Sequence, residues 1–135
     1  MLPRDSSDDP TTGDRTLASV KDGHGFEARV LEPECGTDGV IVVTVAGEVD
    51  MATAGLLWQA LEDACDRAGS AGCVVVDMAD TTFIDSSGLA VLIRTHKRLD
   101  HRPGSVIIRR TAETIRQVLK ISAVDEFIPV IDELP

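Results

Sequence analysis

Hydroxyl and carboxylate side chains crowd one short stretch of the chain, DMADTTFIDSSG, between Asp77 and Gly88. Side chains of these two kinds cap helices, act as nucleophiles or receive phosphate groups. The stretch follows a β-branched run and precedes an amphipathic one. In open α/β sheets, functional groups collect where strands end and helices begin, because backbone N–H groups there favour negative charge. We therefore place the candidate site at this stretch.

Two of the three chemical interpretations of Asp85-Ser86-Ser87-Gly88 need no phosphate. The first is a helix cap, because Asp and Ser are leading residues at that position. The second is a hydrolase nucleophile, which requires glycine two residues to either side of the serine. Neither serine meets that requirement. His96 falls on the apolar face of the following helix, where a satisfied, half-buried imidazole is expected, and His101 follows at the helix end, so no catalytic residue is predicted.

The third interpretation is a phosphorylation switch at a serine of this stretch. A phosphate adds about −1.5 to −2 charges. The helix amino end attracts that charge, so the fold is expected to survive. Asp85 and a docked surface that fits a neutral hydroxyl repel it, so binding is expected to change. Gly88 is expected to let the backbone approach a docked partner. Spacing alone leaves the cap and the switch both open.

Composition narrows the classes of protein and partner. The chain has 135 residues and a formal charge of −10, which suits one domain and argues against nucleic acid, whose phosphates require clustered Lys and Arg. The longest apolar run, residues 40–46, is far shorter than the roughly 20 residues of a membrane-spanning helix. The acidic first residues do not resemble a secretory signal, so we expect a cytoplasmic protein without membrane association.

No metal or cofactor site is predicted. The three cysteines, Cys35, Cys65 and Cys73, lack C-x-x-C spacing, and the histidines form no array with them. We expect reduced, structural thiols.

The elements that must position the candidate site alternate between strands and helices. Residues 1–24 are polar, without apolar periodicity, and are expected to form a flexible tail before a single domain at 25–132. Period-2 and β-branched patterns predict strands, and helical spacing of apolar residues predicts helices. The expected strands are 26–32, 40–46 (after a turn at 35–39), 73–78, 105–109 and a short one within 127–131; the expected helices are 52–68, with Asp50 or Thr53 as cap, about 86–99, and one capped by Thr111.

This order predicts an α/β fold. The first two strands form an antiparallel hairpin, and strands joined through a helix run parallel, so the sheet is mixed. Pro129 favours an edge position for the last strand.

Three motifs in order resemble the STAS domain of bacterial anti-sigma factor antagonists. They are the G-E-V-D turn within VTVAGEVDMATAGLLWQAL, the D-S-S-G-L core of FIDSSGLAVLIRTHKRL, and the ending LKISAVDEFIPV. The resemblance runs from about Phe26 to Ile131. It implies a small single-domain fold with helices packed mainly on one side of the sheet.

The resemblance also implies a function. Members of the family are non-enzymatic regulators that bind an anti-sigma factor, usually a serine kinase, and so free a sigma factor. The first serine of D-S-S-G is the phosphorylated residue, which is Ser86 here, and a phosphatase resets it. Asp85, Ser87 and Gly88 flank that site, and Asp50 of the G-E-V-D turn contributes to the partner-binding surface. A switch of this kind is expected to be a monomer or weak dimer. The alternative is a scaffold or sensor subunit of a larger signalling assembly, which would form a stable oligomer.

Overall fold

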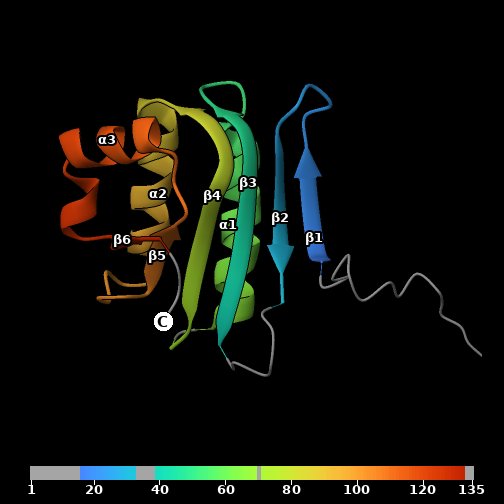
Figure 1. Cartoon of the computed structure of the whole chain (residues 1–135). Helices are drawn as coiled ribbons and strands as arrows, with labels where there is room; N and C mark the ends of the chain where they lie inside the picture. Colours follow the sequence, from blue (N-terminus) through green and yellow to red (C-terminus); the bar gives the residue numbers. More distant parts are fainter. Residues whose placement is uncertain (1–15, 33–38, 70, 133–135) are drawn as a thin grey trace, which may run out of the picture.

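The computed structural model of the chain describes residues 16–32, 39–69 and 71–132. They form one six-stranded sheet, three α-helices and a short 3-10 helix (Figure 1). The strands are β1 (Thr16–Lys21), β2 (Glu27–Leu31), β3 (Val40–Val49), β4 (Cys73–Ile84), β5 (Val106–Arg109) and β6 (Val130–Ile131); the helices are α1 (Ala54–Ala68), α2 (Ser86–Arg98), α3 (Glu113–Ile121) and η1 (Val124–Glu126).

The strands lie side by side in the order of the sequence, from β1 to β6. The first three are antiparallel neighbours, and β3 to β6 are parallel. This division follows from the connections, because a hairpin reverses a strand whereas a helical crossover returns the next strand in the same direction. The α/β class, the mixed sheet and the antiparallel hairpin predicted from the sequence are confirmed.

One apolar core joins the sheet to the helices. Alternate residues of the central strands point into it, such as Val43 and Val45 on β3 and Val76 on β4, and these side chains are at most 1% exposed. Leu57 and Leu61 of α1 contribute to the same core. Figure 1 shows α1 and α2 on the same side of the sheet. None of the helices in the described part of the chain has the length and apolar content to cross a bilayer.

The amino-terminal part of the prediction needs a correction. Residues 16–24 were expected to belong to a flexible tail, but β1 pairs with β2 along its length. Only Ala18 and Val20 of this edge strand pack against the core, and Leu17 is exposed, so the apolar alternation was too weak to predict a strand. Residues 1–15, and Cys35 with most of the expected turn at 35–39, lie outside the described residues.

Two further differences concern strand and helix ends. Strand β4 continues to Ile84, well beyond the expected end at Met78, because two irregularities in its pairing with β3 let both strands run on together. Thr111 does not cap α3. The cap position is Ala112, which makes no side-chain cap hydrogen bond, and the buried Thr111 hydroxyl has no hydrogen-bond partner among the described residues. The expected edge position of the last strand is confirmed, with Pro129 directly before β6.

Candidate functional site

The two strand ends that carry the predicted site are neighbours. Val49, the last residue of β3, pairs with Ile84, the last residue of β4. The backbone N–H of Asp85 donates to the carbonyl of Val49 at 3.1 Å. Asp50 and Asp85 are the next residues of the two strands, so the structure brings them to one edge of the sheet. They precede α1 and α2 respectively, and the two helices therefore begin side by side at this edge.

Asp85 caps α2. Its backbone is extended, and its Oδ1 accepts hydrogen bonds from the N–H groups of Ser87 at 2.8 Å and Gly88 at 3.4 Å. Because the carboxylate takes the capping role, neither serine hydroxyl is needed for it. The cap interpretation is thus correct for Asp85, and it leaves Ser86 available for another role.

Ser86 is the first residue of α2 and is exposed. Among the described residues, its hydroxyl has no hydrogen-bond partner. The first turn of α2 contains no acidic residue. The amino end of the helix favours negative charge, but the N–H groups nearest to Ser86 already bind Asp85. A group attached to the Ser86 oxygen would therefore face both the helix dipole and a carboxylate.

Asp50 organises the turn between β3 and α1. Its Oδ1 accepts hydrogen bonds from the N–H groups of Ala52 at 2.9 Å and Thr53 at 3.2 Å. The Thr53 hydroxyl in turn donates to the carbonyl of Glu48 at 2.8 Å. Thr53 occupies the cap position without a side-chain cap hydrogen bond, so of the two expected caps it is Asp50 whose carboxylate binds backbone N–H groups. Asp50 stays partly exposed at the edge.

Gly88 has a different place from the one expected. It is buried, and a Cβ atom there would lie 2.6 Å from Cγ1 of both Val49 and Ile84. The absent side chain therefore lets α2 rest directly on the ends of β3 and β4. Gly88 positions the site from beneath, and the partner-facing atoms belong to its neighbours.

The two histidines, His96 on α2 and His101 after it, lie away from the serines. His96 is ten residues beyond Ser86 on the same helix, roughly 15 Å along its axis, so it cannot act as a base for that hydroxyl. His96 is buried, its ring centre lies 5.2 Å from those of His101 and Phe127, and its Nδ1 has no hydrogen-bond partner among the described residues. The expectation of a satisfied, half-buried imidazole is therefore wrong. Burial, followed by repulsion from His101, lowers the pKa of His96.

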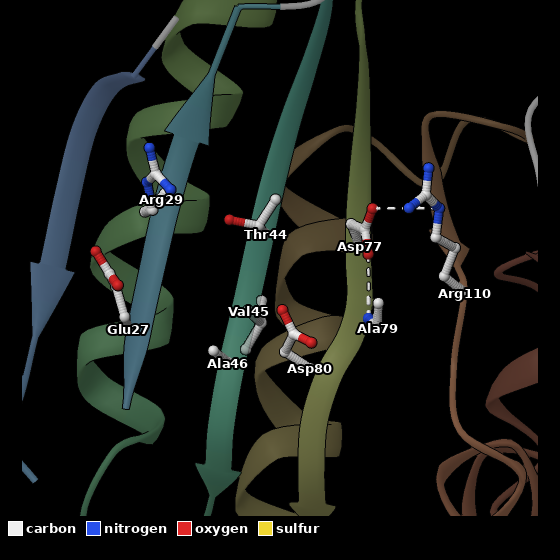
Figure 2. Close-up of a pocket in the computed structure, with 9 residues that line it drawn as sticks. All are labelled: Glu27, Arg29, Thr44, Val45, Ala46, Asp77, Ala79, Asp80 and Arg110. Atoms are coloured by element: carbon white, nitrogen blue, oxygen red, sulfur yellow. Dashed lines mark hydrogen bonds and ion pairs between the residues drawn. The ribbon is translucent and has the colours of Figure 1, made fainter. Parts of the chain in front are cut away.

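A second polar feature lies on the other face of the sheet, and the sequence analysis missed it. Figure 2 shows this hollow, of about 250 Å³, across β2, β3 and β4. Small side chains such as Thr44, Ala46 and Ala79 form its floor. Its charged residues come from three separate segments, so no single local motif reveals them: Glu27 and Arg29, Asp77 and Asp80, and Arg110.

Asp77, within the stretch that drew attention in the sequence, belongs to this second feature. Its Oδ2 accepts a hydrogen bond from Nε of Arg109 at 2.9 Å and lies 3.8 Å from Nε of Arg110. Its Oδ1 accepts from the N–H of Ala79 at 3.1 Å. The side chains of Asp77 and Arg109 are only 8% and 17% exposed, so this is a largely buried and satisfied ion pair. Asp77 therefore holds β4 to the end of β5 and lies apart from the Ser86 edge.

The STAS domain family model matches residues 35–135. A curated relative from Paenibacillus polymyxa, an anti-sigma F factor antagonist, is 24% identical over 94 residues, which are 70% of this chain and 80% of the relative.

Solved structures share the fold. A crystal structure of an anti-sigma factor antagonist from Mycobacterium paratuberculosis is 27% identical, with a TM-score of 0.65, and covers 79% of this chain and 87% of its own. The Bacillus cell fate determinant SpoIIAA in its phosphorylated form is 20% identical, with a TM-score of 0.54, and covers 76% of this chain and 91% of its own.

Proposed function

The chain belongs to the STAS domain family, and from this premise we propose that it is an anti-sigma factor antagonist. It binds an anti-sigma factor with serine kinase activity, and the sigma factor held by that protein is released. The kinase phosphorylates Ser86, which ends the interaction, and a phosphatase restores the hydroxyl. The chain itself catalyses no reaction and acts in the cytoplasm as a monomer or weak dimer. The names of the relatives in P. polymyxa and M. paratuberculosis support the first part.

The observation that carries the proposal is the exposed hydroxyl of Ser86 at the start of a helix that another residue already caps. Asp85 binds the N–H groups of Ser87 and Gly88, so a phosphate on Ser86 would not be neutralised by them. Its charge would instead add to those of Asp85 and Asp50 at the same edge. A partner that fits the neutral hydroxyl would then meet about −1.5 to −2 additional charges.

The proposed contact surface consists of Asp50, Asp85, Ser86 and Ser87, with Gly88 supporting it from beneath. Two carboxylates on this surface, in a chain of net charge −10, favour a partner with a basic contact surface. The phosphorylated form of SpoIIAA, a protein of the same fold, supports this part of the proposal.

The test compares four baits from a native lysate: the wild type, Ser86→Ala, Ser86→Asp and the matched control Ser87→Ala. Captured proteins are identified by mass spectrometry, and the captured kinase is then purified and incubated with each bait and ATP. We expect the kinase on every bait except Ser86→Asp, and phosphate incorporation into the wild type and Ser87→Ala alone. Equal capture by Ser86→Ala and Ser86→Asp would disprove the switch.

A further inference from the structure

Two large apolar side chains are exposed beside Ser86. Five such residues are exposed in the described part of the chain, and Met51 and Phe83 are the two at this edge. Met51 directly follows Asp50 and is 82% exposed, and Phe83 is 46% exposed, three residues before Ser86. Apolar surface left in water does not gain the free energy of burial, and exposed apolar groups gathered at one edge mark an interaction site.

These side chains come to the edge that carries the serine from two different elements. Ile84 points toward α2, where Gly88 rests on it, and adjacent strand residues point to opposite faces. Phe83 therefore projects from the other face of the sheet. Its pairing partner on the neighbouring strand β3 is the exposed residue Glu48. Met51 lies in the turn between β3 and α1. Ser86, at the start of α2, lies at the same edge as both.

Carboxylates lie at the same edge as the two apolar groups. Exposed Glu48 pairs with Phe83 across the strands, and Asp50 and Asp85 are the neighbours of Met51 and Ser86 in the sequence. Apolar groups within a charged border are typical of the centre and rim of protein interfaces. A few buried apolar residues usually supply most of the affinity there, and the flexible thioether of Met adapts to an irregular recess.

We propose that Met51 and Phe83 are the apolar anchors with which the chain holds its anti-sigma factor. This inference rests on the proposed function and extends it: the partner presents apolar recesses bordered by Lys or Arg side chains. Contact at both anchors covers the edge that carries Ser86 and removes water from it. A phosphate on Ser86 would then be buried in an apolar contact, away from the Lys or Arg side chains at its border, and that cost separates the proteins.

The test measures equilibrium binding of the purified kinase identified with the Ser86→Ala bait. The anchor variants are Met51→Ser and Phe83→Ser. The chain offers matched controls of similar exposure on other elements: Ile121→Ser, 85% exposed on α3, and Leu17→Ser, 37% exposed on β1. We expect each anchor variant to weaken binding at least tenfold, mainly through faster dissociation, and each control to stay within twofold of the wild type.

A second measurement needs no variant. In wild-type chain with ¹³C-methyl methionine, the signal of Met51 should shift when the kinase is added, and that of Met78, which is fully buried in the core, should not. The inference is overturned if the wild type binds and both anchor variants bind within twofold of it, or if the Met51 signal stays in place. If no kinase binds the wild type, the proposed function and this inference both fail. If the anchors matter but Ser86→Asp binds like Ser86→Ala, only the switch fails.

Discussion

The backbone N–H of Asp85 donates to the carbonyl oxygen of Val49, with 3.1 Å between nitrogen and oxygen. This bond is made just where the two strands end and the two helices begin. It fixes the start of α2 against the start of α1, so Asp50 and Ser86 are presented together, although 36 positions separate them in the sequence. The site is therefore a property of the β3–β4 pairing rather than of either motif alone.

Removal of the α2 cap should weaken the fold. Asp85→Ala leaves the N–H groups of Ser87 and Gly88 without their acceptor, and we expect a loss of about 0.5–2 kcal/mol in the free energy of unfolding. Asp85→Asn retains an oxygen acceptor and should cost only a few tenths. Urea unfolding followed by circular dichroism measures both. An alanine variant as stable as the asparagine variant would show that the cap contributes nothing.

A methyl group at Gly88 should be destabilising although the residue lies in a helix. The new Cβ would lie 2.6 Å from side-chain carbons of Val49 and Ile84, so we expect Gly88→Ala to lose about 1–3 kcal/mol of stability. Gly55 of α1 is the matched control, because a Cβ there meets nothing within 4 Å. Gly55→Ala should gain about 0.4–1 kcal/mol. The unfolding temperature should therefore fall in Gly88→Ala and rise in Gly55→Ala. A shift in the same direction for both variants would contradict the close packing of Gly88 on Val49 and Ile84.

The ion pair on the open face of the sheet should matter far more than those at the surface. Arg109→Met leaves the Asp77 carboxylate largely buried without its closest cation, and we expect a loss of about 3 kcal/mol. Arg98, which pairs with Asp66 where both side chains are well exposed, provides the control. Arg98→Met should change stability by less than about 1 kcal/mol. The denaturant midpoints of the two variants measure these losses of stability. Similar losses in both would show that the buried pair contributes no more than the exposed one.

Stability should fall on mild acidification because of His96. Its pKa in the folded chain lies below the ordinary value of 6.5, so the unfolded chain takes up the proton first as the pH falls. The contribution of neutral His96 to the free energy of unfolding is intact above about pH 6.5 and is lost progressively below that pH. His96→Phe, which keeps an aromatic ring beside Phe127, should flatten the dependence of unfolding free energy on pH between about 7 and 5.5. A pH dependence as steep in His96→Phe as in the wild type would contradict this explanation.

The elements of the fold were predicted correctly wherever one local sequence pattern determines them. The β-branched run of β3 and the apolar spacing of α1 and α2 identified those elements, and Asp-Ser-Ser placed a helix start at Asp85. That motif also indicated the candidate residue Ser86. Parallel order then followed from the alternation of strands and helices.

What the sequence could not provide depends on contacts between distant segments. Strand β1 depends on its pairing with β2 and on the packing of Ala18 and Val20 against the core, and the hollow on the open face collects residues from separate strands. The role of Gly88 needed the positions of Val49 and Ile84. Thr111 was predicted to cap α3, but the helix begins at Glu113 and its cap position is Ala112, so Thr111 lies one residue too early. The exposure of Met51 and Phe83 could not be predicted either, because the sequence alone does not determine which apolar residues stay in contact with water.

Strand β1 has a practical consequence for work with shortened forms of the protein. A truncation at residue 24, where the polar composition ends, would remove β1 and leave the backbone of β2 as the rim of the sheet. β2 carries the fully buried residues Ala28 and Val30, and its unpaired N–H and C=O groups would become a template for another chain. Such a fragment would retain every residue of the Ser86 surface and yet tend to self-associate, so its aggregation would say nothing about the oligomeric state of the intact protein.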